Sequence, residues 1–359
     1  MVDLANQQVL QGHQVSAVIG FKADDRLLRN ELDTRIAVEY IEQGEGRLRR
    51  YLASLWWLFR RFKHLAEQDI IHAHLTFPAV IATAVYRWRK LRTGKQRPRI
   101  IETYHAVGMP IPTWHRRVHA WMASQRDGLI LMASDHFWEG FVARHPRLPT
   151  RIIPNGLAPP PLRTRTEAAV LAYRETAGLP ADGRLVFGSV GRLAPARRPE
   201  LYVPIFARVS EAFSGNVHFL MAGDGSLRQA IAAQAASVGI ADQLRLPGLA
   251  PDPSLPRALM DLYITINVGP VTGLNGLEAA FAGVPVIAIQ LLEDHVPSED
   301  DWIWSSANAE AVAAEAIRLL GDAQARADLG KRQRAYVETH HTIAAMAEAY
   351  EEFYRAAGA

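Results

Sequence analysis

The sequence of 359 residues contains no cysteine, which excludes disulfide bonds and zinc sites built from thiolates. It has no apolar run of the roughly 18–20 residues that a helix needs to cross a bilayer. Its first residues lack the basic segment and apolar core of a secretory signal. No internal repeat and no low-complexity segment is present. These absences predict a globular protein of the cytoplasm.

The composition is that of an ordinary folded protein, with 49% apolar and 21% charged residues. The net charge is only +3, but basic residues gather in two segments of the first third, 47–63 and 87–99. Positive charge confined to one region predicts an anionic partner for that region. Nucleic acid is disfavoured as that partner, because the arginine clusters belong to no recognisable nucleic-acid-reading module.

Short apolar runs alternate with amphipathic segments along the whole chain, a pattern typical of α/β proteins with doubly wound parallel sheets. In the first half we expect helices at 4–10, 47–66, 77–90, 113–124 and, capped by Ser134, 135–144, with strands at 15–19, 36–40, 69–72, 99–103, 128–132 and 151–153. In the second half we expect strands at 185–190, 217–222, 244–246, 262–266 and 286–289, with helices at 166–177, 199–213, 226–238, 254–259, 275–282, 308–320, 322–339 and 342–357.

Pro154-Asn155-Gly156 and the prolines at 159–161 indicate a turn followed by a stiff linker. We therefore predict a domain at 1–157, a second domain at 158–335, and a C-terminal helix at 336–359 that packs back toward the first domain. Two doubly wound domains leave a cleft between them. Because ligands of such sheets bind outside the carboxyl ends of the strands, that cleft is the expected active site.

Two turns in the second half are suited to a nucleoside diphosphate. Val190-Gly191-Arg192-Leu193, followed by Arg197, links a strand to a helix, and Gly273-Leu274-Asn275-Gly276-Leu277-Glu278 opens another helix. Unpaired N–H groups at a helix N-terminus attract phosphate, two arginines suit a diphosphate, and a glutamate suits ribose hydroxyls. The alternatives are a solvated arginine pair at a strand end and an ordinary carboxylate on a helix face.

Nine segments of the chain, these two turns included, occur in a fixed order. They are Gly12-His13-Gln14-Val15, Asp69–His74 (Asp-Ile-Ile-His-Ala-His), Thr103-Tyr104-His105, Ile153–Gly156, Gly188–Leu193, Ala222–Gly225, Leu244–Gly248, Gly273–Glu278 and Ala282–Ile287. Together they resemble glycosyltransferase family 4, the retaining nucleotide-sugar transferases of the GT-B fold. Each segment is weak evidence by itself, but their order and spacing cover nearly the whole chain.

The resemblance implies a role for each matching residue. Arg192 beside Gly191 would meet the donor diphosphate, and Arg197 occupies a position where the family usually has lysine. The N–H groups of Gly273, Leu274 and Asn275 would face the phosphates. Glu278 would accept hydrogen bonds from the ribose, and His105 matches a histidine that the family places near the transferred sugar. His105, Arg192 and Arg197 are thus the expected catalytic residues. No cluster of residues in the sequence requires a metal, and we expect no cofactor beyond the donor substrate.

The chain departs from the family pattern at two places. The family carries a pair of glutamates, of which Glu278 is the second, and Pro270 stands at the position of the first. This exchange removes a carboxylate from the sugar pocket. The chain also begins inside the helix that the family places after its first strand and glycine-rich turn. We therefore expect the first strand to be missing, through a truncated reading frame or a misassigned start rather than as a true short form.

Two other features allow a functional and a structural interpretation. His72 and His74 alternate along a strand end, which suits a metal site or, in the absence of paired carboxylates, hydrogen bonds within the fold. The helix at 47–63 mixes Trp56, Trp57, Leu52, Leu55 and Phe59 with basic residues at 47, 49, 50, 60, 61 and 63. Such a helix either lies at an anionic membrane or packs its tryptophans on the sheet while its arginines face water.

The resemblance therefore predicts a retaining hexosyltransferase that moves a sugar from a nucleoside diphosphate sugar to a glycan or lipid-linked acceptor. It points to surface polysaccharide or lipopolysaccharide synthesis, in the cytoplasm or peripherally at the inner face of the cell membrane. Two alternatives stay open. Pro270 and the missing first strand favour an inactive nucleotide-sugar-binding homologue or partner subunit, and a nucleotide-sugar epimerase would share the GT-B architecture.

Overall fold

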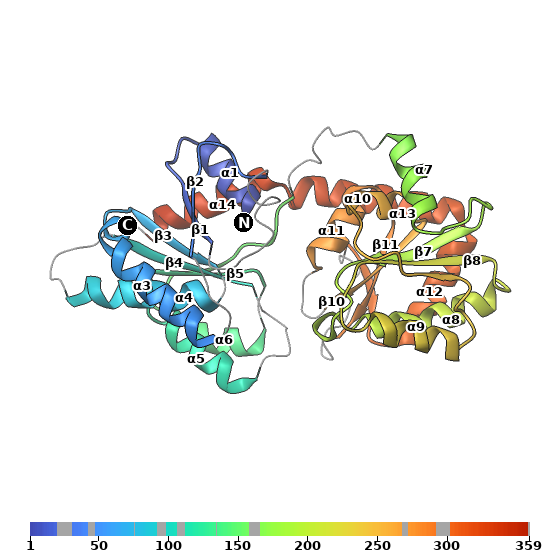
Figure 1. Ribbon diagram of the computed structural model, residues 1–359, viewed down its shortest axis with the longest axis horizontal. Helices are drawn as coiled ribbons and strands as arrows, with labels where there is room; N and C mark the ends of the chain where they lie inside the picture. Colours follow the sequence, from blue (N-terminus) through green and yellow to red (C-terminus); the bar gives the residue numbers. More distant parts are fainter. Residues whose placement is uncertain are drawn as a thin grey trace. The chain divides into compact units, whose positions relative to one another are not determined.

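The computed structural model describes residues 1–19, 31–41, 47–74, 76–91, 98–105, 112–133, 135–157, 166–267, 272–291 and 302–357. The chain forms two compact units (Figure 1). Unit 1 comprises Met1–Ala158 together with Ile343–Ala359, and unit 2 comprises Pro159–Thr342. Neighbouring strands in both units are parallel.

Unit 1 contains two parallel sheets. Its strands are β1 (Ser16–Ile19), β2 (Ala37–Tyr40), β3 (Ile70–His74), β4 (Arg99–Tyr104), β5 (Gly128–Leu131) and β6 (Thr150–Ile152). β1 pairs with β2, and the second sheet has the order β3-β4-β5-β6. The helices are α1 (Val2–Leu10), α3 (Arg47–Ala66), α4 (Thr76–Leu91), α5 (Thr113–Ala123), α6 (His136–Arg144) and the C-terminal α14 (Ile343–Ala356).

Apolar side chains on both faces of the four-stranded sheet explain why helices cover both faces. Ile101 packs with α1 and α14, whereas its neighbour Ile100 packs with α3 and α4, because successive side chains of a strand point to opposite faces. Gly128 provides the space for the Phe353 ring of α14, since a Cβ at this position would lie 2.6 Å from that ring. The last helix of the chain is therefore part of the core of unit 1.

Unit 2 is one six-stranded parallel sheet of order β12-β11-β10-β7-β8-β9. Its strands are β7 (Leu185–Val190), β8 (Val217–Ala222), β9 (Leu244–Arg245), β10 (Leu262–Asn267), β11 (Val286–Gln290) and β12 (Trp304–Ser306). Its helices are α7 (Glu167–Thr176), α8 (Tyr202–Ala212), α9 (Arg228–Ser237), α10 (Ser254–Ala258), α11 (Leu274–Phe281), α12 (Ala309–Gly321) and α13 (Ala323–His340). The strand order reverses between β7 and β10, which is the topological switch point of a doubly wound sheet.

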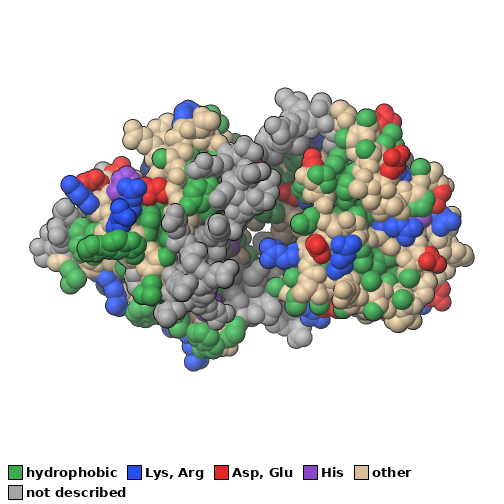
Figure 2. Space-filling model, viewed as in Figure 1, with side chains coloured by type: hydrophobic (Ala, Val, Ile, Leu, Met, Phe, Trp, Pro, Cys, Tyr) green, Lys and Arg blue, Asp and Glu red, His purple; other side chains and the backbone are tan. Residues whose placement is uncertain are grey.

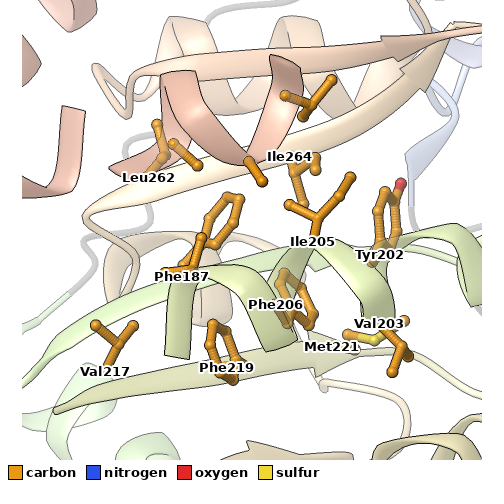
Figure 3. Packing of buried hydrophobic residues seen from close by; sticks show 14 of the residues in the cluster. Phe187, Tyr202, Val203, Ile205, Phe206, Val217, Phe219, Met221, Leu262 and Ile264 are labelled. Carbon is orange, nitrogen blue, oxygen red and sulfur yellow. The ribbon is translucent and has the colours of Figure 1, made fainter. Parts of the chain in front are cut away.

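Three phenylalanines form the centre of the core of unit 2, between the sheet and α8 (Figure 3). The Phe206 ring stacks on Phe219 at 4.5 Å and meets Phe187 edge-on at 5.2 Å. All three side chains are fully buried. Aromatic pairs in such geometries contribute about 0.5–1.5 kcal/mol beyond the area that they bury. This core holds β7 and β8 rigidly, and both strands end at the predicted diphosphate site.

The predicted α/β class is confirmed, and most predicted elements lie within two residues of the observed ones. Three local predictions need correction. β12 was not predicted, the helix expected from 199 begins as a 3-10 turn, η2 (Pro199–Leu201), and β3 continues to His74. Ser134, the predicted cap of α6, lies outside the described residues, and Asp135 Oδ1 accepts the capping hydrogen bond from Trp138 N–H at 3.0 Å.

The C-terminal segment divides between the units later than residue 336. α13 belongs to unit 2, where the Gln333 side chain pairs with both backbone groups of Val286 at 2.8 Å. The segment that belongs to unit 1 begins at Ile343, whose N–H donates to Leu157 O at 2.9 Å. The predicted boundary at 157/158 compares with a division after Ala158.

Candidate active site

The predicted site residues fall into two groups, one in each unit. His105 follows β4 in unit 1, whereas Gly191, Arg192, Arg197, Gly273, Leu274, Asn275 and Glu278 belong to unit 2. All of them follow the carboxyl ends of parallel strands or lie on the helix after such a strand. This is the edge at which doubly wound sheets bind their ligands. Pro270 lies outside the described residues.

β7 and β10 separate at the switch point, and side chains take over from the backbone pairing. The register of the two strands ends at Gly188 and Tyr263. Beyond it, the Tyr263 hydroxyl accepts from Val190 N–H at 3.1 Å and donates to Val190 O at 3.0 Å. Asn275 Nδ2 donates to the same carbonyl at 2.7 Å. The side chain of Asn275 thus fixes α11 next to Gly191, and only its backbone N–H remains for the predicted phosphate contact.

The loop after β7 is held by the glycine loop after β8. Gly191 N–H donates to Ala222 O, and Leu193 N–H donates to Asp224 O, both at 2.9 Å. A Cβ on Gly223 would lie 1.9 Å from Gly191 O, so only glycine allows this approach. Asp224 Oδ1 accepts from Gly225 N–H at 2.8 Å, a hydrogen bond typical of turns.

Arg192 and Arg197 are the exposed cations of this edge. Arg192 follows Gly191 directly, and Arg197 ends the short 3-10 turn η1 (Pro195–Arg197). Neither guanidinium has a hydrogen bond or an ion pair with another residue in the part of the chain that the structure describes. The neighbouring Arg198, by contrast, is paired with Glu200 at 2.7 Å. Arg192 and Arg197 are therefore available to an anionic ligand.

The N-terminus of α11 provides backbone donors at the same edge. Gly273 is its N-cap and offers no side chain to cap the helix. The N–H groups of Leu274 and Asn275 have no acceptor among the described residues. Apart from its two chain neighbours, no other described residue has an atom within 4 Å of the place where a Gly273 Cβ would stand. Open N–H groups at a helix N-terminus form a site for an anion when cationic side chains are near.

Glu278 lies one turn into α11 and is paired with a residue that the sequence analysis did not single out. Its Oε2 accepts a hydrogen bond from Arg257 Nη2 of α10. The Arg257 side chain is only 5% exposed, whereas that of Glu278 is 37% exposed. The buried Arg257 thus binds the carboxylate from the protein interior, while the carboxylate remains partly open to solvent. The available signal was an arginine within the apolar run Leu255–Leu259.

His105 belongs to a histidine cluster in unit 1. His105 Nε2 and His74 Nδ1 are hydrogen-bonded at 3.0 Å, and the His74 and His72 rings lie 4.1 Å apart. His72 Nε2 contacts Thr103 Oγ1 and its Nδ1 contacts Tyr354 Oη, both at 2.7 Å. Burial lowers the pKa of His105 to about 4 and that of His72 to about 3. The cluster is neutral at pH 7, so His105 can serve as a hydrogen-bonding group but not as a standing charge.

The structural interpretation of His72 therefore agrees with its hydrogen bonds to Thr103 and Tyr354. In the described ranges, no three His, Asp or Glu side chains are arranged to share a metal ion.

Two family models match the chain, one in each half. "Glycosyltransferase Family 4" matches residues 1–159, and "Glycosyl transferases group 1" matches residues 184–322. The curated proteins contain no significant match.

Solved structures share the fold at low sequence identity. HepE of Anabaena, in complex with UDP and glucose, superposes with a TM-score of 0.78 at 17% identity, covering 99% of this chain and 94% of that one. A glycosyltransferase of Rickettsia africae gives 0.73 at 14% identity, covering 99% and 93%. Sucrose-phosphate synthase of Thermosynechococcus elongatus gives 0.68 at 17% identity, covering 98% and 91%.

The two doubly wound units, the sugar-transferase family models in both halves and the shared architecture lead to one conclusion. This chain belongs to glycosyltransferase family 4 and is a transferase of the GT-B fold.

Proposed function

We propose that this transferase moves a sugar from a nucleoside diphosphate sugar to a glycan or lipid-linked acceptor, with retention of configuration at the anomeric carbon. One observation carries the donor part of the proposal. Within the described part of the chain, Arg192, Arg197 and the open N–H groups of α11 are donors without partners, on the loops that flank the switch point of unit 2. Unsatisfied cations and amides at such an edge suit a diphosphate.

The chemistry follows from where negative charge develops. In the proposed reaction the bond between the anomeric carbon and the diphosphate oxygen breaks, and the acceptor oxygen bonds to the same face of that carbon. The acceptor proton passes to the leaving phosphate. Arg192, Arg197 and the α11 amides stabilise the charge that grows on that phosphate, a contribution that is usually large. Glu278 accepts from the ribose hydroxyls, and neutral His105 hydrogen-bonds to the transferred sugar.

Neighbours with the same fold support the donor class and the pathway. HepE structures contain UDP, UDP with glucose, or UDP-glucose. WaaG, which is described as a glycosyltransferase involved in lipopolysaccharide biosynthesis, superposes with a TM-score of 0.63 at 16% identity, covering 97% of this chain and 94% of that one. We therefore place UDP-sugars first among the donors and a surface polysaccharide or lipopolysaccharide first among the products.

Binding of nucleoside diphosphates tests the donor site directly. We expect one of UDP, GDP, ADP, CDP and dTDP to raise the melting temperature by several degrees, because a ligand at 100 times its Kd stabilises the folded state by about 2.7 kcal/mol. The measurement is a thermal-shift titration, with inorganic phosphate and the free nucleoside as controls. Equal shifts with all anions, or none, would contradict the proposal.

Turnover then separates the remaining interpretations. Nucleotide release that depends on an added acceptor supports transfer. Nucleotide binding without turnover would identify an inactive homologue, and conversion of the donor sugar without any acceptor would identify an epimerase.

We further propose that unit 1 contacts an anionic membrane, through α3. Trp56 and Phe59 are 59% and 78% exposed, their rings stack, and the Arg60 guanidinium lies 5.5 Å from the Trp56 ring. Trp57 packs instead with the core around Leu58, so Trp56 faces solvent and Trp57 faces that core. The side chains of Arg47, Arg49, Arg50 and Leu55 lie outside the described residues. No described helix is long and apolar enough to cross a membrane.

α5 adds a second exposed aromatic face in the same unit. Trp114, Val118 and Trp121 are 67%, 47% and 52% exposed, and their spacing places them on one side of the helix. Arg87 of α4 lies 5.0 Å from the Trp121 ring. In Figure 2, apolar and basic side chains stand next to each other over the part of unit 1 that contains these helices. Aromatic rings flanked by arginines suit the headgroup region of an anionic bilayer.

Vesicle binding tests this surface. Replacing Trp56 and Phe59 together with serine is expected to weaken binding to phosphatidylglycerol-containing vesicles at least about tenfold, because each buried aromatic side chain contributes roughly 1.5–3 kcal/mol. The measurement is sedimentation with vesicles of increasing anionic content. Leu249→Ser, at an 80% exposed leucine of unit 2, is the matched control. Binding that ignores both anionic lipid and the double substitution would remove the membrane from the proposal.

A further inference from the structure

Arg257 is a buried cation of unit 2 with an incomplete set of partners. Its side chain is 5% exposed, and its Nη2 donates to Glu278 Oε2. Its Nε has no hydrogen-bond partner among the described residues. Burying a guanidinium is costly unless a charge and hydrogen bonds compensate. A buried arginine in a short helix whose other buried residues are apolar suggests a specific use for its charge.

The pair lies at the switch point itself. Tyr263, whose hydroxyl holds both backbone groups of Val190, is in electrostatic range of both Arg257 and Glu278. Asn275, three residues before Glu278, donates to the same Val190 carbonyl. The Arg257–Glu278 pair therefore lies near the end of β7, where the loop with Arg192 begins.

We infer that Arg257 is a positioning residue for the nucleotide ribose, acting through Glu278. This inference rests on the proposed donor site. Arg257 holds one oxygen of the carboxylate and thereby fixes the plane in which Glu278 receives the ribose hydroxyls. It also cancels the carboxylate charge, which would otherwise repel the diphosphate of the same ligand.

The balance of charge explains why the arrangement needs a buried arginine. A glutamate that accepts from ribose hydroxyls must stay ionised, because a carboxylate is the stronger acceptor. A carboxylate close to a diphosphate is repelled by it, and this repulsion is largest where water is excluded. A guanidinium placed behind the carboxylate removes the repulsion without occupying the ligand's side. Lysine would supply the charge but not the planar fork.

The experiment compares Arg257→Met, Arg257→Lys, Glu278→Gln and Arg257→Met/Glu278→Gln by calorimetric titration. The two ligands are the nucleoside diphosphate that gives the largest thermal shift and its 2′,3′-dideoxy analogue. We expect Arg257→Met to weaken the complete nucleotide about tenfold or more, since a hydrogen bond to a charged group is lost or misdirected. Arg257→Lys should lose less of this affinity than Arg257→Met. Arg257→Met should weaken binding of the dideoxy analogue, which lacks the ribose hydroxyls, less than it weakens binding of the nucleoside diphosphate.

Two comparisons show that the effect passes through Glu278. In the Glu278→Gln background, the Arg257→Met exchange should change affinity no more than about twofold, because coupled residues are not additive. Arg245→Met removes an arginine of β9 whose described hydrogen bonds all go to backbone carbonyls, and it should leave the affinity for both ligands unchanged.

Each contrary result has one meaning. Equal losses for both ligands in Arg257→Met, or additive losses in the double variant, would make Arg257 a structural residue and overturn the inference. Unchanged affinity in a folded Arg257→Met protein would also overturn it, while leaving the donor site in place. A parent protein that binds no nucleoside diphosphate would overturn the proposed function and the inference together. Should Arg257→Met fail to fold, Arg257→Lys is read by the same two-ligand comparison.

Discussion

Replacing Arg192 with alanine is expected to lower kcat/KM for sugar transfer by about 100- to 1,000-fold, the usual cost of removing one donor to a developing anion. Arg192 is exposed and has no polar partner among the described residues, so its loss should leave the melting temperature unchanged. The measurement is nucleotide release from UDP-glucose with an acceptor present, together with a thermal melt of both proteins.

Matched variants separate charge from geometry. Arg197→Lys introduces the lysine that the family usually has at this position, and it should retain most activity. Arg197→Ala, which removes the charge, should lose most activity. Arg208→Ala, in which an exposed arginine of α8 loses its pairing with Glu211 and Glu310, is the control for removing an arginine from unit 2. Two results would argue against a diphosphate at this loop. One is full activity in Arg192→Ala, and the other is a loss of activity that a lowered melting temperature accounts for.

Replacing Glu102 with leucine is expected to destabilise unit 1 by about 3–5 kcal/mol, because it leaves a buried guanidinium without its counterion. Glu102 is fully buried in β4, with one oxygen bonded to His119 Nε2 and the other to Arg126 Nε at 2.8 Å. Arg126 also donates to Thr83 Oγ1 and to Ala79 O. The carboxylate and Arg126 together therefore join β4, α4 and α5.

Hydrogen exchange is the appropriate measurement, since a chain of two units need not unfold in one step. The amides of β4 and β5 should exchange at least about 100-fold faster in Glu102→Leu, while those of β7 and β8 keep their protection. Glu352→Leu is the control, because its exposed pair with Arg151 should contribute less than about 1 kcal/mol. Unchanged protection in β4 would show that Arg126 finds other compensation.

Periodicity allowed most of the fold to be predicted. β7 (Leu-Val-Phe-Gly-Ser-Val) and β8 (Val-His-Phe-Leu-Met-Ala) are mostly apolar runs, which is typical of strands buried on both faces. β12 escaped because Trp304–Ser306 is three residues long and has no apolar pattern, so only its pairing with β11 defines it. The role of Glu102 was not predicted although it lies in a clear apolar strand. A single acid within an apolar strand does not reveal its partners, which come from residues 17 and 24 positions later.

The site was predictable where it depends on local sequence. Gly191, Arg192 and Gly273 follow strands, and the position of a strand end follows from the run that precedes it. Contacts between elements were not predictable, because Val190, Tyr263 and Asn275 meet only once the sheet order is set. The partners of Glu278 and His105 belong to the same class. Arg257 and His74 are 21 and 31 positions away along the chain.

The division of unit 1 into two sheets gives β3 an open side. Its carbonyl and amide groups pair with β4, and no described strand pairs with them on the other side. The strand carries no acidic or lysine side chain that would deter a foreign strand. β3 is therefore an edge strand without the charges that usually discourage strand addition, and self-association of the concentrated protein is expected to involve Ile70–His74.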